Sequence, residues 1–237
     1  MIPQNDIKSS KLKHGLYVVS TPIGNLADIT FRAIKILQHV DIILAEDTRV
    51  TKKLLKHYQI KKEVMPFHTH NEHKLLNKYV KIIINGKQIG LVSDAGTPAI
   101  SDPGFLLIRE CVKNQIQIEC LPGPTAMIPA LVNSSIACER FVFEGFLPLK
   151  KGREKRIKEL KDEKRTIILY ESPHRLLKTL SQISYHFGPK RFASISREMT
   201  KIYEETKRGS LMDLIAYFES IKIKGEFVIV ISAQSKS

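Results

Sequence analysis

Short apolar runs rich in β-branched residues alternate with segments of helical periodicity through the first 120 residues, and no other feature limits the fold as strongly. The runs predict strands at 16–20, 41–45, 64–67, 88–92 and 116–120. The segments between them predict helices at 31–37, behind a capping Thr30, and at 48–58, 71–85 and 105–113. Strands that are separated by helices usually pair in parallel. The pattern therefore predicts an α/β domain with a mostly parallel sheet covered by helices on both faces.

The second half of the chain restarts the alternation after an interruption between Pro122 and Arg140. It predicts strands at 141–143, 166–170, 191–196, near 203–206 and at 227–231, and helices at 150–160, from 174 to about 186, and at 210–218. The expected organisation is a flexible tail at 1–13, an N-terminal α/β domain at 14–122, a connecting helix and linker at 123–140, and a C-terminal α/β domain at 141–237.

The composition excludes several classes of protein. Hydrophobic residues make up 43% of the chain, enough for a folded core, and no run approaches the roughly 18 apolar residues of a membrane span. The three cysteines form no C-x-x-C pair, so neither a disulfide framework nor a zinc site is expected. His68, His70 and His73 lack a helical metal-binding spacing and predict a loop near substrate or solvent, with no metal. These features together predict a cytoplasmic protein.

The net charge favours a polyanionic partner but does not distinguish one kind of polyanion from another. Lysine and arginine number 38 against 24 aspartate and glutamate, which leaves a net charge of +14. RNA, DNA and an acidic membrane surface all fit this excess, and so does a general lysine-rich background. The densest basic segment is 150–165, with nine basic and four acidic residues.

Three loops are unusually rich in glycine and proline: 21–25, 93–104 and 122–126. Each follows a predicted strand, where ligands bind in open parallel sheets. Glycine permits a close approach of the backbone and proline fixes turns, so the loops together predict a backbone-lined binding site. The chain contains no G-x-x-x-x-G-K-[ST] motif and no G-x-G-x-x-G motif after the first strand, which argues against a P-loop nucleoside triphosphatase and an ordinary dinucleotide dehydrogenase.

Six segments in order resemble the tetrapyrrole-methylase superfamily, in particular its branch that acts on small-subunit ribosomal RNA. The segments are 16–26, 45–49, 93–104, 122–126, 170–175 and 197–201, and the resemblance extends from about Gly15 to Ile231. In precorrin methylases the second glycine-rich loop carries Gly-Asp-Pro. Here the triplet is Gly96-Thr97-Pro98, which separates this chain from the cobalamin branch.

The resemblance implies a class III methyltransferase that uses S-adenosylmethionine, with two α/β domains, the cofactor in the cleft between them, and a homodimeric state. It implies as substrate the ribose 2'-hydroxyl of a cytidine in the decoding region of 16S ribosomal RNA, within the 30S subunit. The cofactor residues implied by position are Pro22, Ile23, Gly24, Ser93, Asp94, Ala95, Gly96, Thr97, Ile100, Ser101, Thr125, Ala126, Tyr170, Gly225 and Glu226.

Methyl transfer to a hydroxyl requires alignment of the reacting atoms and removal of one proton, and it requires no metal. Asp47, Glu46 and Glu171, in that order, are the candidate bases, because each lies at or just after the end of a predicted strand. The alternative for the segment 46–49 is a helix N-terminal cap, and the two roles are compatible.

Basic residues near these segments are candidates for contacts with RNA phosphates. They are Arg49, Lys150, Lys151, Arg153, His174, Arg175, Arg197 and Lys201. His174 and Arg175 also stand at a predicted helix start, where anions bind, and for 155–164 a solvated helix face is the simpler interpretation. Two alternatives remain open at this point: a methylase of a tetrapyrrole-like small molecule, and a non-catalytic ribosome-associated RNA-binding protein.

Overall fold

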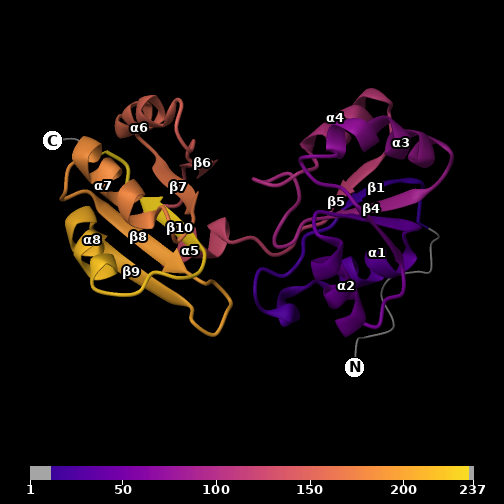
Figure 1. Cartoon of the computed structure of the whole chain (residues 1–237), viewed down its shortest axis with the longest axis horizontal. Helices are drawn as coiled ribbons and strands as arrows, with labels where there is room; N and C mark the ends of the chain where they lie inside the picture. The colour runs from indigo at the N-terminus through magenta and orange to yellow at the C-terminus, as the bar shows by residue number, and fades with distance from the viewer. Residues whose placement is uncertain (1–11, 235–237) are drawn as a thin grey trace. The chain divides into compact units, whose positions relative to one another are not determined.

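The computed structural model describes residues 12–234, and the chain divides into two compact units, Met1–Thr125 and Ala126–Ser237 (Figure 1). Most of the predicted tail at 1–13 lies outside the described residues. The predicted linker segment 123–140 contains a helix, α5 (Met127–Asn133). Each unit carries its own five-stranded sheet, which confirms the predicted fold class of two α/β domains.

The sheet of unit 1 is entirely parallel, as the alternation predicts. Its strands are β1 (Gly15–Val18), β2 (Ile42–Ala45), β3 (Glu63–Pro66), β4 (Gln88–Val92) and β5 (Ile118–Cys120), in the spatial order β3-β2-β4-β1-β5. The helices are α1 (Phe31–His39), α2 (Thr48–His57), α3 (Glu72–Ile84) and α4 (Phe105–Lys113), with a short 3-10 turn, η1 (Leu26–Asp28), after β1. The strand order places β1, β2 and β4 inside the sheet, where both faces need cover.

Alternating side chains on the strands supply the two cores of unit 1. Leu16 and Val18 on β1 pack in the same cluster as α3 and α4, whereas Tyr17 and Val19 pack in the cluster of α1 and α2. Figure 1 shows α1 and α2 on one side of the sheet and α3 and α4 on the other. Thr30 begins α1 as predicted, because its hydroxyl oxygen accepts a hydrogen bond from the Ala33 N–H at 3.0 Å.

The sheet of unit 2 is mixed. Its strands are β6 (Phe141–Phe146), β7 (Thr166–Glu171), β8 (Phe192–Arg197), β9 (Glu205–Ser210) and β10 (Phe227–Ile231), in the order β6-β7-β10-β8-β9. Only the β6–β7 pair is parallel; the β7–β10, β10–β8 and β8–β9 pairs are antiparallel. The helices α6 (Arg153–Lys161), α7 (Leu176–Phe187) and α8 (Leu211–Glu219) share one buried cluster with this sheet, and α5 packs against β7 and β10.

One predicted strand is displaced. The strand expected near 203–206 begins at Glu205 and continues to Ser210. Glu198 and Thr200 have left-handed backbones (φ 50° and 65°), so the chain turns there and leaves Tyr203 exposed before pairing resumes. Pairing with β8 then extends over six residues of each strand. The displacement comes from a turn that no glycine or proline marks.

The described residues contain neither a membrane-spanning helix nor a metal-binding group of side chains. Across residues 12–234 no helix is long and apolar enough to cross a bilayer. In the same part of the chain no three histidine, cysteine, aspartate or glutamate side chains form a group that could hold a metal ion.

Candidate functional site

The three glycine- and proline-rich loops follow three adjacent strands. The loop 21–25 follows β1, the loop 93–104 follows β4, and the loop 122–126 follows β5, and β1 lies between β4 and β5 in the sheet. Because all three strands are parallel, their carboxyl ends lie at one edge of the sheet. The topology of unit 1 therefore brings these loops together.

Hydrogen bonds join the loops to one another. Thr21 and Gly96 exchange two backbone hydrogen bonds, each 2.9 Å long, as an isolated antiparallel bridge. The hydroxyl oxygens of Ser20 and Thr97 lie 2.9 Å apart, and the Thr97 hydroxyl also donates to the carbonyl oxygen of Pro124 at 3.4 Å. Ser20 and Thr21 lie in the segment 16–26 but are not among the predicted cofactor residues, although both are buried polar residues at the end of an apolar strand. Their contacts make the loop cluster a connected structure.

Glycine is required where the loops pass closest. A Cβ on Gly123 would stand 2.7 Å from the Ser20 Cβ, and one on Gly104 would stand 2.8 Å from a methyl group of Leu91. Gly96 has φ +80°, a left-handed backbone that strains other residues. Ala99 and Ser101 adopt left-handed values (70° and 64°) without being glycine. Strained backbone of this kind gathers at binding sites, and the surrounding structure holds it in place.

The predicted cofactor residues of unit 1 lie on this cluster in three degrees of exposure. Those that are exposed are Gly24, Asp94, Ala95, Ile100 and Ser101. Those that are half-buried are Pro22, Ile23, Thr97 and Thr125, and those that are buried are Ser93 and Gly96. Ala126 is the residue that precedes α5 in unit 2 and is half-buried.

Three carboxyl groups gather beside the loops. Glu46 and Asp47 follow β2, which pairs with β4, and Asp94 follows β4. The Asp47 N–H donates to an oxygen of Asp94 at 2.9 Å. Burial, together with the charge of Asp94, raises the pKa of Glu46, and burial raises the pKa of Asp94. Raised pKa values at a carboxyl edge of this kind mark groups that can exchange protons nearer to neutral pH.

Asp47 differs from its neighbours. Its carboxylate caps α2 by accepting from the Arg49 N–H at 2.8 Å, and the Arg49 guanidinium binds it with distances down to 2.6 Å. These hydrogen bonds lower the pKa of Asp47 to about 2. The cap expected for this segment is therefore present, and Arg49, a predicted RNA contact, is paired with Asp47.

Glu171 lies inside unit 2, in an ionic cluster. Its side chain is buried, accepts from the Thr179 hydroxyl at 2.6 Å, and lies 3.3 Å from the Arg175 guanidinium and 3.9 Å from that of Arg153. Arg153 is itself 4% exposed and donates to Thr179 and to the side chain of Gln182. The structure thus brings three predicted site residues together, Glu171, Arg153 and Arg175, in a place where they neutralise one another.

A second cluster of unit 2 centres on Glu198, which the sequence pattern did not single out by itself. Its carboxylate accepts from the Lys201 ammonium at 2.9 Å and from the Glu226 N–H at 3.0 Å. Lys201 also contacts the Glu226 carboxylate at 2.9 Å, and a Cβ on Gly225 would collide with Glu198. Arg197 lies 3.9 Å from Glu205. The predicted residues Arg197, Lys201, Gly225 and Glu226 are therefore neighbours.

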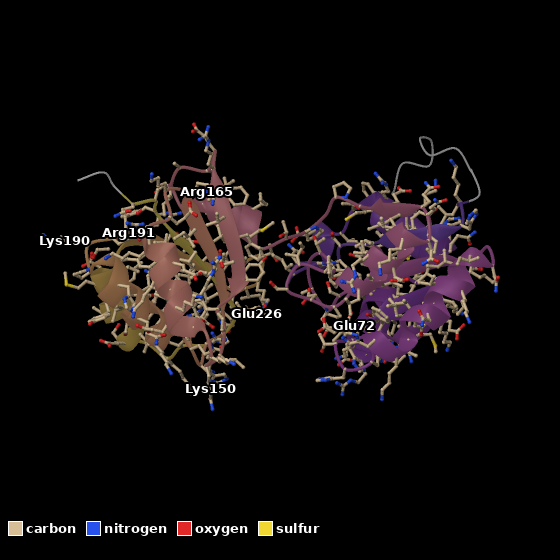
Figure 2. All side chains as sticks on the ribbon, turned by 90° about the horizontal axis from the view of Figure 1, so that it is seen from above. Glu72, Lys150, Arg165, Lys190, Arg191 and Glu226 are labelled. Atoms are coloured by element: carbon tan, nitrogen blue, oxygen red, sulfur yellow. The ribbon has the colours of Figure 1, made fainter. Side chains whose placement is uncertain are left out.

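The remaining predicted residues of unit 2 belong to neither the Glu171 cluster nor the Glu198 cluster. The Tyr170 ring makes edge contacts with Phe143 and Phe146, at centroid distances of 4.9 and 5.8 Å. Lys150, Lys151 and His174 are exposed, and Figure 2 shows Lys150 extending away from unit 2. Of the basic candidates in this unit, these three are available to a phosphate without breaking an internal ion pair that the structure describes.

The histidines of 68–73 occupy the same edge as the carboxylates. His68 follows β3, the neighbour of β2, and its charge would lower the pKa of Glu46. The His68 and His70 rings pack edge to face, with their centroids 5.8 Å apart. His73 lies in the first turn of α3. The expected loop position thus holds for His68 and His70, and the sheet order explains how His68 comes near Glu46.

Comparison with known proteins places the chain among methylases. The family model described as Tetrapyrrole (Corrin/Porphyrin) Methylases matches residues 15–215. A Synechocystis protein named Ribosomal RNA small subunit methyltransferase I is 49% identical over 92% of this chain and 78% of its own length. A Thermotoga maritima protein of the same name is 46% identical over 92% of this chain and 98% of its own.

Solved structures agree on the fold. A cobalt precorrin-4 methyltransferase, 17% identical, superposes with a TM-score of 0.68 over 92% of this chain and 94% of its own. A diphthine synthase, 11% identical, superposes with a TM-score of 0.72 over 94% of this chain and 91% of its own. The resemblance drawn from the six sequence segments is confirmed, and the chain belongs to the tetrapyrrole (corrin/porphyrin) methylase family.

Proposed function

We propose that this protein is an S-adenosylmethionine-dependent methyltransferase of small-subunit ribosomal RNA, and that it methylates the ribose 2'-hydroxyl of a cytidine in the decoding region. The names of relatives at 41–49% identity support the RNA substrate. The observation that carries the chemistry is the edge of unit 1, where Glu46, with its raised pKa, lies beside Asp94 of the loop 93–104, one of the three connected loops.

The loops fit the proposed cofactor. S-adenosylmethionine supplies a methyl group activated by a positive sulfonium. The loops offer exposed residues at Gly24 and Ala95, a left-handed glycine at Gly96, and an exposed carboxylate at Asp94. Neutral backbone with one carboxylate suits a ligand that carries a cationic ammonium and sulfonium together with an adenine ring. Tyr170, Gly225 and Glu226 remain the cofactor residues proposed for unit 2 on the family resemblance.

Glu46 is the proposed general base. A 2'-hydroxyl loses its proton as the new bond forms, and an acceptor works best when its pKa lies near the working pH. Burial and Asp94 move the pKa of Glu46 in that direction, whereas Arg49 holds the pKa of Asp47 at about 2. Asp47 then serves to begin α2 and to donate its N–H to Asp94. Glu171, which is buried between two guanidinium groups, has no comparable access to a substrate.

The proposal has further parts that rest on the resemblance: a homodimer, an assembled 30S particle as substrate, and action in the cytoplasm where ribosomes assemble. The competing small-molecule methylase would use the same loops but a different acceptor. Gly96-Thr97-Pro98 in place of Gly-Asp-Pro and the names of the relatives favour RNA.

Methyl transfer from radiolabelled S-adenosylmethionine tests the proposal. The acceptors are 30S particles from cells that lack this modification, protein-free 16S RNA, and a precorrin. Label in 30S particles, at a cytidine whose 3' phosphodiester resists alkaline hydrolysis, is the expected result, because a 2'-O-methyl group blocks cleavage. Label in the precorrin alone would favour the small-molecule enzyme. Failure of the protein to bind S-adenosylmethionine in titration calorimetry would contradict any methylase.

A further inference from the structure

Helix α2 and the turn after it carry a basic surface that the sequence pattern did not single out. Residues 48–62 contain six lysine and arginine residues and no aspartate or glutamate. Apart from Arg49, which pairs with Asp47, these cations form what we call the α2 lysine surface: Lys52, Lys53, Lys56, Lys61 and Lys62. All but Lys62 are exposed. Because no acidic residue is interleaved, the segment cannot neutralise itself.

A surface pocket of about 580 Å³ lies within this lysine surface. Its lining residues are Lys52, Leu55, Lys56, Gln59, Ile60, Lys61 and Lys62. Leu55 and Ile60 are buried core residues and supply an apolar base, while four lysines surround them. Such a pocket suits an anion attached to an apolar or weakly polar body, such as the phosphate and ribose of a nucleic acid.

The backbone at the end of α2 builds the pocket. The Gln59 N–H donates to the Lys56 carbonyl at 3.1 Å, and the Ile60 N–H donates to the Leu55 carbonyl at 2.8 Å, which is the Schellman arrangement. Gln59 takes the left-handed position, with φ 56°, where glycine is usual. This turn reverses the chain and sets Lys61 and Lys62 beside Lys56. Stabilisation of the helix end by basic residues accounts for Lys56, but not for Lys61 and Lys62, which lie beyond it.

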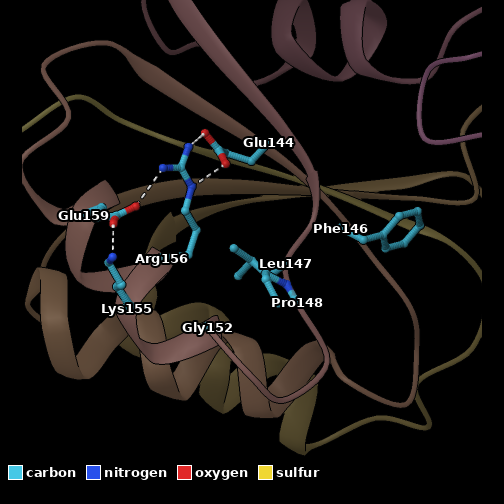
Figure 3. A pocket seen from close by; sticks show the side chains of 8 residues that line it. All are labelled: Glu144, Phe146, Leu147, Pro148, Gly152, Lys155, Arg156 and Glu159. Atoms are coloured by element: carbon cyan, nitrogen blue, oxygen red, sulfur yellow. Dashed lines mark hydrogen bonds and ion pairs between the residues drawn. The ribbon is translucent and has the colours of Figure 1, made fainter. Parts of the chain in front are cut away.

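The pairing of these lysines differs from that of the other basic helix. Among the ion pairs of residues 12–234, none includes Lys52, Lys53, Lys56, Lys61 or Lys62, although Asp41 lies near enough to Lys62 to feel its charge. On α6, Lys155 pairs with Glu159, Lys158 with Glu154, and Arg156 with both Glu144 and Glu159. Figure 3 shows three of these pairs, those of Lys155 and Arg156, at a smaller pocket. The positive charge of α6 is therefore largely neutralised by ion pairs within unit 2. The positive charge of the α2 lysine surface is not, so it is available to a negatively charged partner.

The position of α2 links this surface to the proposed site. The helix begins at Thr48, directly after Glu46 and Asp47, and its ten residues span roughly 15 Å at 1.5 Å per residue. The pocket is lined from Lys52 onward, toward the far end of the helix. A polyanion with one nucleotide at the carboxyl edge could therefore reach the lysines with its neighbouring phosphates.

We infer that the α2 lysine surface binds the phosphate backbone of the ribosomal RNA substrate at nucleotides that flank the modified one. This inference rests on the proposed function. RNA is favoured over a membrane because the surface continues from the proposed catalytic edge of unit 1. It is favoured over an acidic protein because a lysine-rimmed pocket with an apolar base matches the repeating phosphate and ribose.

The test compares two double substitutions that remove the same charge from different helices. Lys52→Gln with Lys56→Gln removes two unpaired cations, and Lys155→Gln with Lys158→Gln removes two paired ones. Binding to 30S particles that lack the modification is measured across about 50 to 200 mM salt. The α2 variant is expected to bind roughly tenfold more weakly, with the slope of log K against log salt reduced by about 1 to 2. The α6 variant should match the parent within about twofold.

Each other outcome overturns the inference. Equal losses in the two variants would show a general charge effect, and an unchanged salt slope in the α2 variant would contradict phosphate contacts at this surface. If the parent methylates 30S particles while the α2 variant binds them normally, only the inference fails. If the parent neither binds nor methylates them, the proposed function fails as well. Loss of binding to phosphatidylserine vesicles, with 30S binding intact, would assign the surface to a membrane.

Discussion

Two glutamates stand at strand ends, one in each unit, in opposite surroundings. Glu46 follows β2 of unit 1, beside Asp94 and Asp47, and burial with the charge of Asp94 raises its pKa. Glu171 ends β7 of unit 2, is 2% exposed, and lies within ion-pair distance of two guanidinium groups. Both positions qualified as candidate bases in the sequence, because each follows an apolar strand.

The difference shows that position on a strand does not decide what a carboxylate does. The Glu171 oxygens accept from Thr179 and from the Ser172 N–H and face Arg175 and Arg153, so the group holds unit 2 together. Glu46 faces other carboxylates and no arginine among its main electrostatic neighbours, which favours proton uptake. The comparison therefore supports Glu46 as the proposed base and gives Glu171 a structural role.

Glu46→Gln should have the largest effect on turnover. Loss of a positioned base costs about 10²- to 10⁴-fold, and an amide of the same shape cannot accept the proton. Methylation of 30S particles under single-turnover conditions measures this loss of rate, and urea unfolding checks that the fold is retained. Turnover equal to that of the parent would end the assignment of Glu46.

The pH profile supplies the control for Glu46. A base must be deprotonated to act, so the rate of the parent should fall about tenfold per pH unit below the raised pKa of Glu46, at a midpoint above 4.5. Glu46→Gln should lack this limb. Stability has the opposite sign, because a raised carboxyl pKa makes the fold lose stability as pH rises from the ordinary pKa to the raised one. The substitution should therefore stabilise the protein at neutral pH but not in acid.

Glu171→Ala should have the largest effect on folding. Removal of one partner of a buried ion pair costs about 3–5 kcal/mol, since Arg153 and Arg175 would lose their carboxylate. The denaturant midpoint in urea measures this loss. Glu171→Gln, which can still accept from Thr179, should lose less. A well-folded Glu171→Gln protein without turnover would break the comparison by giving Glu171 a chemical role.

Gly96→Ala should sharpen the comparison by locating the cofactor at the edge that carries Glu46. A left-handed backbone costs a non-glycine residue about 1–2 kcal/mol. Gly86 offers a matched control, with φ +91° and no atom within 4 Å of an added Cβ. Both alanine variants should lose similar stability in urea, but only Gly96→Ala should weaken S-adenosylmethionine binding in calorimetry. Equal cofactor affinity in the two variants would remove this loop from the proposed cofactor site.

Sequence periodicity predicted most of the helices and strands, because in those segments the local preference of the residues and their packing in the core favour the same structure. The strand 88–92, the helix 105–113 and the strand 227–231 have the predicted bounds, since each is an apolar segment bounded by turn residues. The antiparallel pairs of unit 2 did not show in the pattern. A buried strand has the same composition whichever way its neighbour runs, and β7, β8 and β10 are buried over most of their length.

The candidate site was harder to predict because pairing depends on tertiary neighbours. In the sequence, Arg153 is one of nine basic residues in 150–165. In the structure it is buried and donates a hydrogen bond to Gln182, 29 residues away along the chain. The acid-free segment 48–62 was visible in the sequence, but the sequence does not show which cations lack a partner. Charge density along the chain therefore does not separate paired cations from unpaired ones, whereas the three loop motifs follow adjacent strands of one sheet.

Asp47→Asn is the smallest expected change. Asparagine begins helices about as well as aspartate, so α2 should keep its cap while the pairing with Arg49 weakens. Turnover should change less than about fivefold, the range of an exposed ion pair. Because the pKa of Asp47 is lowered to about 2, its contribution to stability is present above about 3.8 and lost as pH falls toward 2. Acid unfolding of the asparagine variant should lack this component, and Asp47→Ala, without a cap, should be less stable at every pH. A loss of turnover as large as that of Glu46→Gln would transfer the proton-accepting role to Asp47, and it would mean that pairing with an arginine does not disqualify a carboxylate at this edge.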